Sequence, residues 1–348
     1  MTSTDVAATV LWTAATLYAV LGGADFGVGF WDLVAGGAKR GARPRALIDR
    51  ALAPVWEANH VWLIFALVVL WTAFPRAFAA VTTTLFVPLA LAALGIVLRG
   101  SGFAFRKVVG DVGSQRLAGA TFALSSVLTP FFMGTAIGAI ATGRVPATGS
   151  GDRLTSWLNL TSLEIGALFV AACAYLAAVF LVADARRVGD TQLERYFRVR
   201  ALAAAAVTGA LAAGGLFALH EHARSLFDGL IHEGLPLVIA SAVCGSAALI
   251  LLGRAGWRAP RALAAAAVAS VIWGWGIAQY PYLLPRSLTV HAGAGAHGSV
   301  VALLIVCGVA LIVVVPALLL LFSLHQRSLL EEAHAGDPVG DRTSSAPS

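Results

Sequence analysis

Long apolar runs separated by short polar stretches make up most of this chain. Each run approaches or exceeds the roughly 20 residues that a helix needs to cross about 30 Å of hydrocarbon. Charged residues and Pro/Gly clusters mark where one run ends and the next begins. The pattern predicts nine transmembrane helices, at residues 6–34, 52–73, 77–99, 117–141, 159–183, 200–219, 235–253, 261–279 and 299–323.

Composition gives the same fold class. Of 348 residues, 59% are hydrophobic and 12% are charged, and the mean hydropathy is +0.83, which excludes a water-soluble globule. We therefore expect an all-α polytopic membrane protein. The first ten residues carry Asp5 and no Lys or Arg, so they lack the basic region of a cleaved signal peptide, and the first helix is expected to remain in the mature protein.

Net charge and cysteines exclude other classes. The net charge of +6 does not indicate a nucleic-acid partner, because no soluble basic module is present. Cys173, Cys244 and Cys307 each stand alone within an apolar run. Structural disulfides, zinc sites and a covalent haem-attachment motif are therefore not supported.

The 24 Lys and Arg residues divide unequally between the two sets of loops, with 19 in one set and 5 in the other. Basic residues accumulate on the cytoplasmic side of a membrane. The alternation predicts that the N-terminus lies outside and the C-terminus lies in the cytoplasm.

The loops are short, and the outer loop 142–152, rich in Gly, Pro and Thr, is the best candidate for an internal boundary. We expect a first four-helix bundle at residues 1–145 and a second at 153–282. The ninth helix and its preceding outer loop take residues 283–325. Residues 326–348 have too little apolar content to pack and are expected to be disordered.

Four acidic residues lie inside or at the edges of the expected helices. Near a bilayer centre a charged side chain costs roughly 2.5–3.5 kcal/mol, so each is a candidate functional group. The first helix places two of them on one stripe, whose glycines would admit a neighbouring helix closely. Asp25 then either handles protons or forms a hydrogen bond across that helix contact. The four acids are Asp25, Asp32, Glu57 and Glu164, and the stripe also contains Tyr18, Gly22 and Gly29.

Glu57 lies seven residues past Arg50, hence ~10 Å into the second helix on its cytoplasmic half. It shares a helix face with Trp56 and His60, whereas Asn59 is expected to point away from that face. Burial favours the protonated form of a carboxylate, so Glu57 could carry protons along a ladder with the two acids of the first helix. Alternatively, Glu57 pairs with an Arg or a His for structure alone.

Two other kinds of site are disfavoured. Glu57-x-x-His60 is half of a di-iron motif, but the sequence lacks the second half. His60 as a haem ligand would be alone at membrane depth. Thr161-Ser162-Leu163-Glu164 is a capping-box pattern, which predicts a structural role for Glu164 at the start of the fifth helix. We predict no metal site.

Five motifs form a more specific pattern, which spans almost the whole chain and is densest in its first 110 residues. They are Asp25–Gly29 (DFGVG), Ala53–Leu63 (APVWEANHVWL), Phe74–Pro75, Arg99–Arg106 (RGSGFAFR), which is expected to follow the third helix, and Tyr280–Pro285 (YPYLLP). This pattern resembles subunit II of the cytochrome bd-type quinol oxidases.

The resemblance implies two four-helix bundles plus one peripheral helix in a bacterial plasma membrane. It also implies a partner, subunit I, which holds two haem b groups, one haem d and the quinol site. Such a complex oxidises quinol and reduces dioxygen to water with cytoplasmic protons. No cofactor is predicted within this chain, although some members hold a structural quinone that the sequence neither locates nor excludes. Membrane lipid and quinol are further expected partners, and the sequence does not decide whether a small single-helix accessory subunit is also present. No nucleic-acid partner is expected.

By the same resemblance, Glu57 delivers protons towards the oxygen site. Many relatives have Asp there, and some carry a second Asp in the first helix where this chain has Leu21-Gly22-Gly23. His60 stands where some members have Gln. The predicted proton path is Glu57, Asp25, His60 and Asp32, supported by Trp56, Asn59, Arg99 and Arg106, with the two arginines at its cytoplasmic entrance.

Two alternatives remain open. The first is a proton-coupled secondary transporter, which usually has two similar halves with broken helices at matching positions; the second half of this chain has no counterpart to the polar run around Glu57. The second is an assembly scaffold with no proton role.

Overall fold

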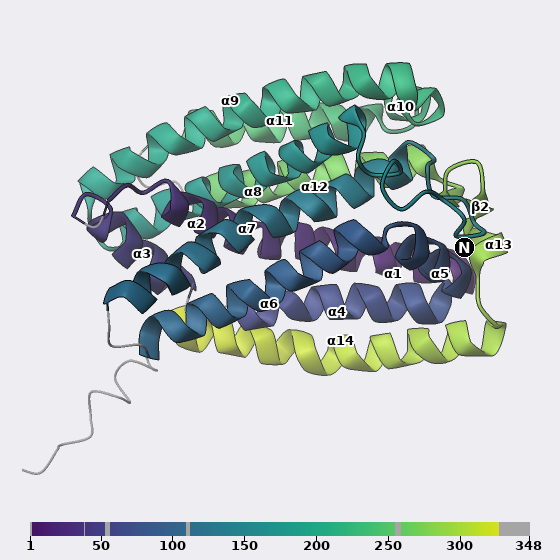
Figure 1. Ribbon diagram of the computed structural model, residues 1–348, viewed down its shortest axis with the longest axis horizontal. Helices are drawn as coiled ribbons and strands as arrows, with labels where there is room; N and C mark the ends of the chain where they lie inside the picture. The colour runs from purple at the N-terminus through teal and green to yellow at the C-terminus, as the bar shows by residue number, and fades with distance from the viewer. Residues whose placement is uncertain (1, 38, 53–55, 109–111, 255–258, 327–348) are drawn as a thin grey trace, which may run out of the picture. The chain divides into compact units, whose positions relative to one another are not determined.

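The computed structural model describes residues 2–37, 39–52, 56–108, 112–254 and 259–326. Contacts divide the chain into a large unit of residues 1–300 and a small unit of residues 301–348. The helices of the large unit run roughly side by side (Figure 1). Within it, α3 lies at one end, and α5, α10, α13 and the N-terminus lie at the other (Figure 1).

The first membrane helix is built from three consecutive segments. They are α1 (Ser3–Leu17), a π-helical turn η1 (Tyr18–Gly22) and α2 (Gly23–Leu33), which together form one apolar span. Single π-turns inside α-helices occur frequently at functional sites. This one ends three residues before Asp25.

The second and third membrane helices differ from the expected boundaries. After α3 (Ala42–Leu52) come α4 (Trp56–Ala73), α5 (Pro75–Thr84) and α6 (Phe86–Val108). The axes of α4 and α5 are bent by 116° at the break between them, because Pro75 cannot continue the hydrogen-bonding pattern of α4 and instead starts a new helix. The third span is therefore Phe86–Phe105, and the expected helix at 77–99 is wrong in its position.

The remaining membrane helices follow in the expected order, and a short helix that was not expected, α10, lies between two of them. They are α7 (Val112–Ala141), α8 (Leu160–Arg187), α9 (Thr191–His222), α10 (Arg224–Ile231), α11 (Leu235–Leu252) and α12 (Ala259–Gln279). A short hairpin follows, in which β1 (Tyr282–Leu284) pairs antiparallel with β2 (Leu288–Thr289), with Tyr282 opposite Thr289. The chain continues through α13 (Val290–Gly293) into α14 (His297–Gln326).

Within the described ranges, 8 helices are long and apolar enough to cross a membrane, or 9 if the bent pair counts as one span. The all-α polytopic class is therefore confirmed. The division into two four-helix bundles stays a prediction, and the tail 327–348 lies outside the described residues.

The main hydrophobic core of the large unit is centred on α8, which packs against α2, α7 and α9, and α2 also packs against α7. A Cβ added at Gly27 would overlap the backbone carbonyl of Cys173 in α8, and one added at Gly29 would overlap the side chain of Ser126 in α7. The indole Nε1 of Trp31 donates a 2.8 Å hydrogen bond to the Ala174 carbonyl of α8. The expectation that glycines of the first helix admit close neighbours is confirmed for Gly29.

Candidate functional site

A buried polar cluster surrounds Asp25, in the first turn of α2. Asp25 is 8% exposed and Asn59, on α4, is 4% exposed. The amide Nδ2 of Asn59 donates a 2.5 Å hydrogen bond to Asp25 Oδ2 and a longer one, 3.4 Å, to the carbonyl of Leu21. An amide nitrogen carries two donors, so Asn59 can serve both acceptors and hold α4 to the first membrane helix.

Arg99 is the cation of the cluster. Its side chain is 2% exposed; Nη2 donates to the backbone carbonyl of Asp25 at 2.9 Å, and Nε donates to Ser126 Oγ at 3.0 Å. The guanidinium carbon lies 5.0 Å from the ring centre of Phe26 and 5.1 Å from that of Phe122. The buried charge of Arg99 is therefore stabilised by two hydrogen bonds that it donates and by cation–π contacts with two aromatic rings.

The position of Arg99 corrects the sequence analysis. The motif Arg99–Arg106 was expected to follow the third helix, with its arginines at a cytoplasmic entrance. Because α6 continues to Val108, Arg99 lies inside the span and reaches the Asp25 cluster instead. In the sequence, a charged residue that follows an apolar run looks like the end of a helix. Only the buried partners of Arg99 show that it lies inside the span.

His60 and Tyr18 border the same cluster. The His60 ring meets the Tyr18 ring edge-on at 6.0 Å between centres and the Phe26 ring at 6.1 Å. Both Asn59 and His60 therefore contact the first membrane helix, although Asn59 was expected to point away from the face that carries His60. Consecutive side chains on a helix point about 100° apart. Asn59 and His60 can both reach the first membrane helix because that helix packs against the part of the α4 surface that lies between them.

Asp32 lies seven residues beyond Asp25, about 10 Å along α2. It is 4% exposed, and its Oδ1 accepts a 2.8 Å hydrogen bond from Arg45 Nε in an ion pair. Arg45 also donates to the carbonyl of Gly36 at 2.6 Å. Arg45 and Ser126 are the partners that sequence reasoning missed, because each contact joins separate elements.

Three predicted site residues have side chains outside the described part of the structure. They are Trp56, Glu57 and Arg106. The backbone of Glu57 is described and lies in the first turn of α4, two residues before Asn59.

Glu164 does not take the expected capping role. The N-cap of α8 is Asn159, whose side chain accepts a 3.0 Å hydrogen bond from Ser162 N. The helix therefore begins earlier than the capping-box pattern at Thr161 predicts, and Glu164 falls in its second turn.

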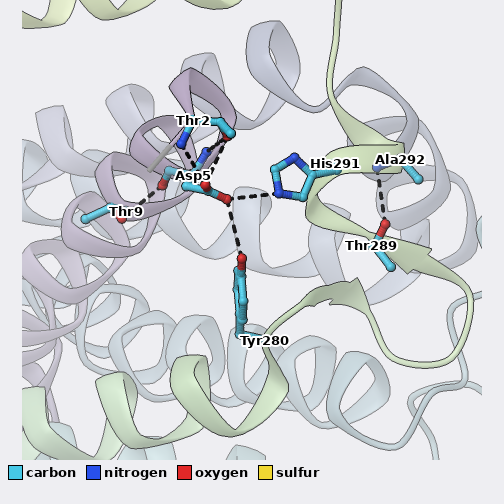
Figure 2. A network of polar contacts seen from close by, with 7 residues as sticks. All are labelled: Thr2, Asp5, Thr9, Tyr280, Thr289, His291 and Ala292. Carbon is cyan, nitrogen blue, oxygen red and sulfur yellow. Dashed lines mark hydrogen bonds and ion pairs between the residues drawn. The ribbon is translucent and has the colours of Figure 1, made fainter.

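A second polar network lies at the N-terminal end of α1 (Figure 2). Asp5 accepts a 2.8 Å hydrogen bond from Thr2 N, pairs with His291 Nε2 at 3.2 Å and accepts a long bond, 3.5 Å, from the Tyr280 hydroxyl. The motif Tyr280–Pro285 thus contacts the start of the chain. Across the ranges that the structure describes, no group of three or more His, Cys, Asp and Glu side chains could hold a metal ion.

The sequence matches the family described as "Cytochrome bd terminal oxidase subunit II" over residues 3–325. This match places the polytopic helical chain in the class of membrane oxidoreductase subunits. The chain belongs to the cytochrome bd oxidase subunit II family, whose members pair with subunit I in a quinol oxidase complex of the respiratory chain.

Individual relatives agree with this assignment. A Bacillus subtilis (strain 168) protein, named provisionally as a cytochrome bd menaquinol oxidase subunit II, is 26% identical over 93% of this chain and 96% of its own length. The cytochrome bd-I ubiquinol oxidase subunit 2 of Escherichia coli (strain K12) is 28% identical over 55% of this chain and 50% of its own. A chain in the structure of bd oxidase from Geobacillus thermodenitrificans superimposes with a TM-score of 0.75, at 25% identity, over 93% of this chain and 99% of its own.

Proposed function

We propose that this chain is the haem-free subunit II of a quinol:oxygen oxidoreductase in a bacterial plasma membrane. It scaffolds the haem-bearing subunit I and contributes a cytoplasmic proton path to the site of oxygen reduction. The observation that carries the proposal is the 2.5 Å hydrogen bond from Asn59 to Asp25, which ties a buried carboxylate to the helix that carries Glu57.

In this proposal each residue of the path has a separate role. Glu57 accepts protons from the cytoplasmic side, and Asp25 passes them on at membrane depth beside His60. Asn59 and Arg99 keep the Asp25 backbone and carboxylate in place, while the Asp32–Arg45 pair marks the cytoplasmic end of α2. Trp56 and Arg106 support the path near its entrance.

Cofactors and further partners are proposed from the family resemblance. Two haem b groups, one haem d and the quinol site are proposed to lie in subunit I, where the electron chemistry takes place. The residues of this chain then supply structure and protons. The proposed layout keeps bundles at 1–145 and 153–282, with the N-terminus outside and the C-terminus in the cytoplasm.

The test is neutralisation of the carboxylates in the complete complex. Glu57→Gln and Asp25→Asn should each lower quinol:oxygen turnover at least several-fold while the haem absorption spectrum is retained, because an amide cannot take up and release a proton. Glu57→Asp is the control, since it keeps a titratable group, and its turnover should stay near that of the parent. Parent turnover in both amide variants would leave the chain as a scaffold without a proton role.

A further inference from the structure

The hydroxyl of Tyr18 is a buried polar group without a protein partner. Tyr18 is 6% exposed, and no hydrogen-bond partner for its hydroxyl is found in the described part of the chain. Folded proteins rarely leave a buried hydroxyl unpaired, and an internal water molecule is a frequent partner in such cases.

The direction of the Tyr18 ring is unusual. Long side chains in α-helices normally lean back over the preceding turn. Here a Cβ added at Gly22 would lie 2.9 Å from Cε2, 3.0 Å from Cδ2 and 3.5 Å from Cζ of Tyr18, so the ring lies over the following turn. The glycine leaves the space that the ring fills.

The groups around the hydroxyl are polar on one side and aromatic on the other. The Tyr18 ring meets Phe26 edge-on at 6.4 Å and His60 at 6.0 Å. Phe26 in turn lies 5.0 Å from the guanidinium carbon of Arg99, so the Tyr18 ring borders the buried cluster.

We propose that the Tyr18 hydroxyl, together with Asp25 and His60, binds an internal water molecule that links these groups in one proton path. The inference rests on the proposed function and names a further positioning residue for it. The hydroxyl accepts one hydrogen bond and donates another, so a proton can arrive on one side while a proton leaves on the other, and Tyr18 ends neutral as it began. Its ring lies against Gly22.

Tyr18→Phe in the complete complex removes only the hydroxyl. The chain offers a matched control in Tyr175 of α8, which is 5% exposed and whose hydroxyl also has no partner among the described residues. Infrared difference spectra, recorded in normal water and in water enriched in oxygen-18, report the O–H stretch of the bound water. The carboxyl stretch of Asp25 is assigned by its loss in Asp25→Asn.

Tyr18→Phe should abolish an isotope-sensitive water band, shift the Asp25 carboxyl band and lower turnover several-fold, with haem spectra and melting temperature retained. Tyr175→Phe should leave all of these unchanged. An unshifted Asp25 band together with an intact water band in Tyr18→Phe would overturn the inference. If Asp25→Asn keeps full turnover while Tyr18→Phe still loses the water band, the water site stands and the proposed proton path fails.

Discussion

Arg99 can be buried in an apolar helix because its charge has directed partners. Two of its nitrogens donate to an α2 carbonyl and an α7 hydroxyl, and the guanidinium carbon lies over the rings of Phe26 and Phe122. A Lys ammonium is a strongly hydrated point charge and cannot reproduce this planar arrangement.

We therefore expect Arg99→Lys to behave as a disruptive substitution. It should lower the yield of haem-containing complex and its melting temperature, measured by absorption spectroscopy and thermal unfolding. Ser126→Ala removes one neutral acceptor of Arg99 and should cost only about 1–3 kcal/mol. Equal losses in the two variants would mean that the second donor and the ring contacts of Arg99 contribute little.

Asn59 gives a second prediction, because its amide donates a hydrogen bond to the Asp25 carboxylate at a buried position. Asn59→Ala should destabilise the complex by about 1.5–3 kcal/mol, the usual contribution of a hydrogen bond to a charged group. The coupling can be measured by thermal unfolding in a double-mutant cycle with Asp25→Ala, which removes the acceptor. Additive effects of the two substitutions would contradict a direct Asn59–Asp25 interaction.

The packing of α2 against α8 gives a prediction about an element. A Cβ at Gly27 would overlap the backbone of α8, which cannot move as a flexible side chain can. Gly27→Ala should therefore destabilise the protein by about 1–3 kcal/mol, the usual range for overpacking. Gly209→Ala in α9 is the control, since nothing lies within 4 Å of its added Cβ, and its melting temperature should stay the same or rise.

The start of α9 depends on the charge of Asp190. Its Oδ1 accepts hydrogen bonds from Gln192 N at 3.1 Å and Leu193 N at 3.0 Å, and its Oδ2 pairs with Arg43 at 2.7 Å. The hydrogen bond from the Leu193 backbone, together with Arg43, holds the pKa of Asp190 below its usual value.

A depressed pKa stabilises the folded state above the unfolded pKa, which is about 3.9 for Asp. This contribution is lost as the pH falls through the lower, folded-state pKa. Asp190→Ala should therefore lower the melting temperature at pH 7, and the difference from the parent should shrink below about pH 4. Asp190→Asn retains an acceptor at the N-cap, so its melting temperature should lie between those of the parent and of Asp190→Ala. A difference that does not change with pH would contradict a role for the charge.

The apolar pattern was sufficient to predict the fold class, yet not every boundary. Residues 74–99 are almost continuously apolar, so periodicity could not locate the sharp bend before Pro75 or the true start of the third span at Phe86. A bend within an apolar run leaves the composition of the run unchanged, so composition does not reveal it. The π-turn before Asp25 likewise leaves no distinctive pattern in the sequence.

The sequence predicted individual residues of the candidate site better than it predicted the contacts between them. Asp25 stood out because lipid penalises a charge, and Asn59 and His60 because they interrupt an apolar helix. Their mutual contacts depend on how α4 packs against the first membrane helix, across 34 residues of chain. The roles of Arg99 and Ser126 required knowledge of three separate helices.

The orientation of the whole chain in the membrane is the last prediction, and it decides whether the proposed path can work. Moving Arg99 from a loop into α6 changes the tally of basic residues from 19 against 5 to 18 against 5, so the preference for a cytoplasmic C-terminus is unaffected. The loop before α8 and the turn after it are separated by a helix of 28 residues, about 42 Å long, and must lie on opposite sides.

Single cysteines at these two sites test the orientation. A membrane-impermeant maleimide added to intact cells should label Ser150→Cys, whereas Val188→Cys should react only after the membrane is opened. The parent chain, whose own cysteines are Cys173, Cys244 and Cys307, gives the background labelling. The reverse pattern would place the Asp32–Arg45 end of α2 outside the cell, and Glu57 would then lie on the wrong side to collect cytoplasmic protons, so the proposed path would fail even with every buried contact intact.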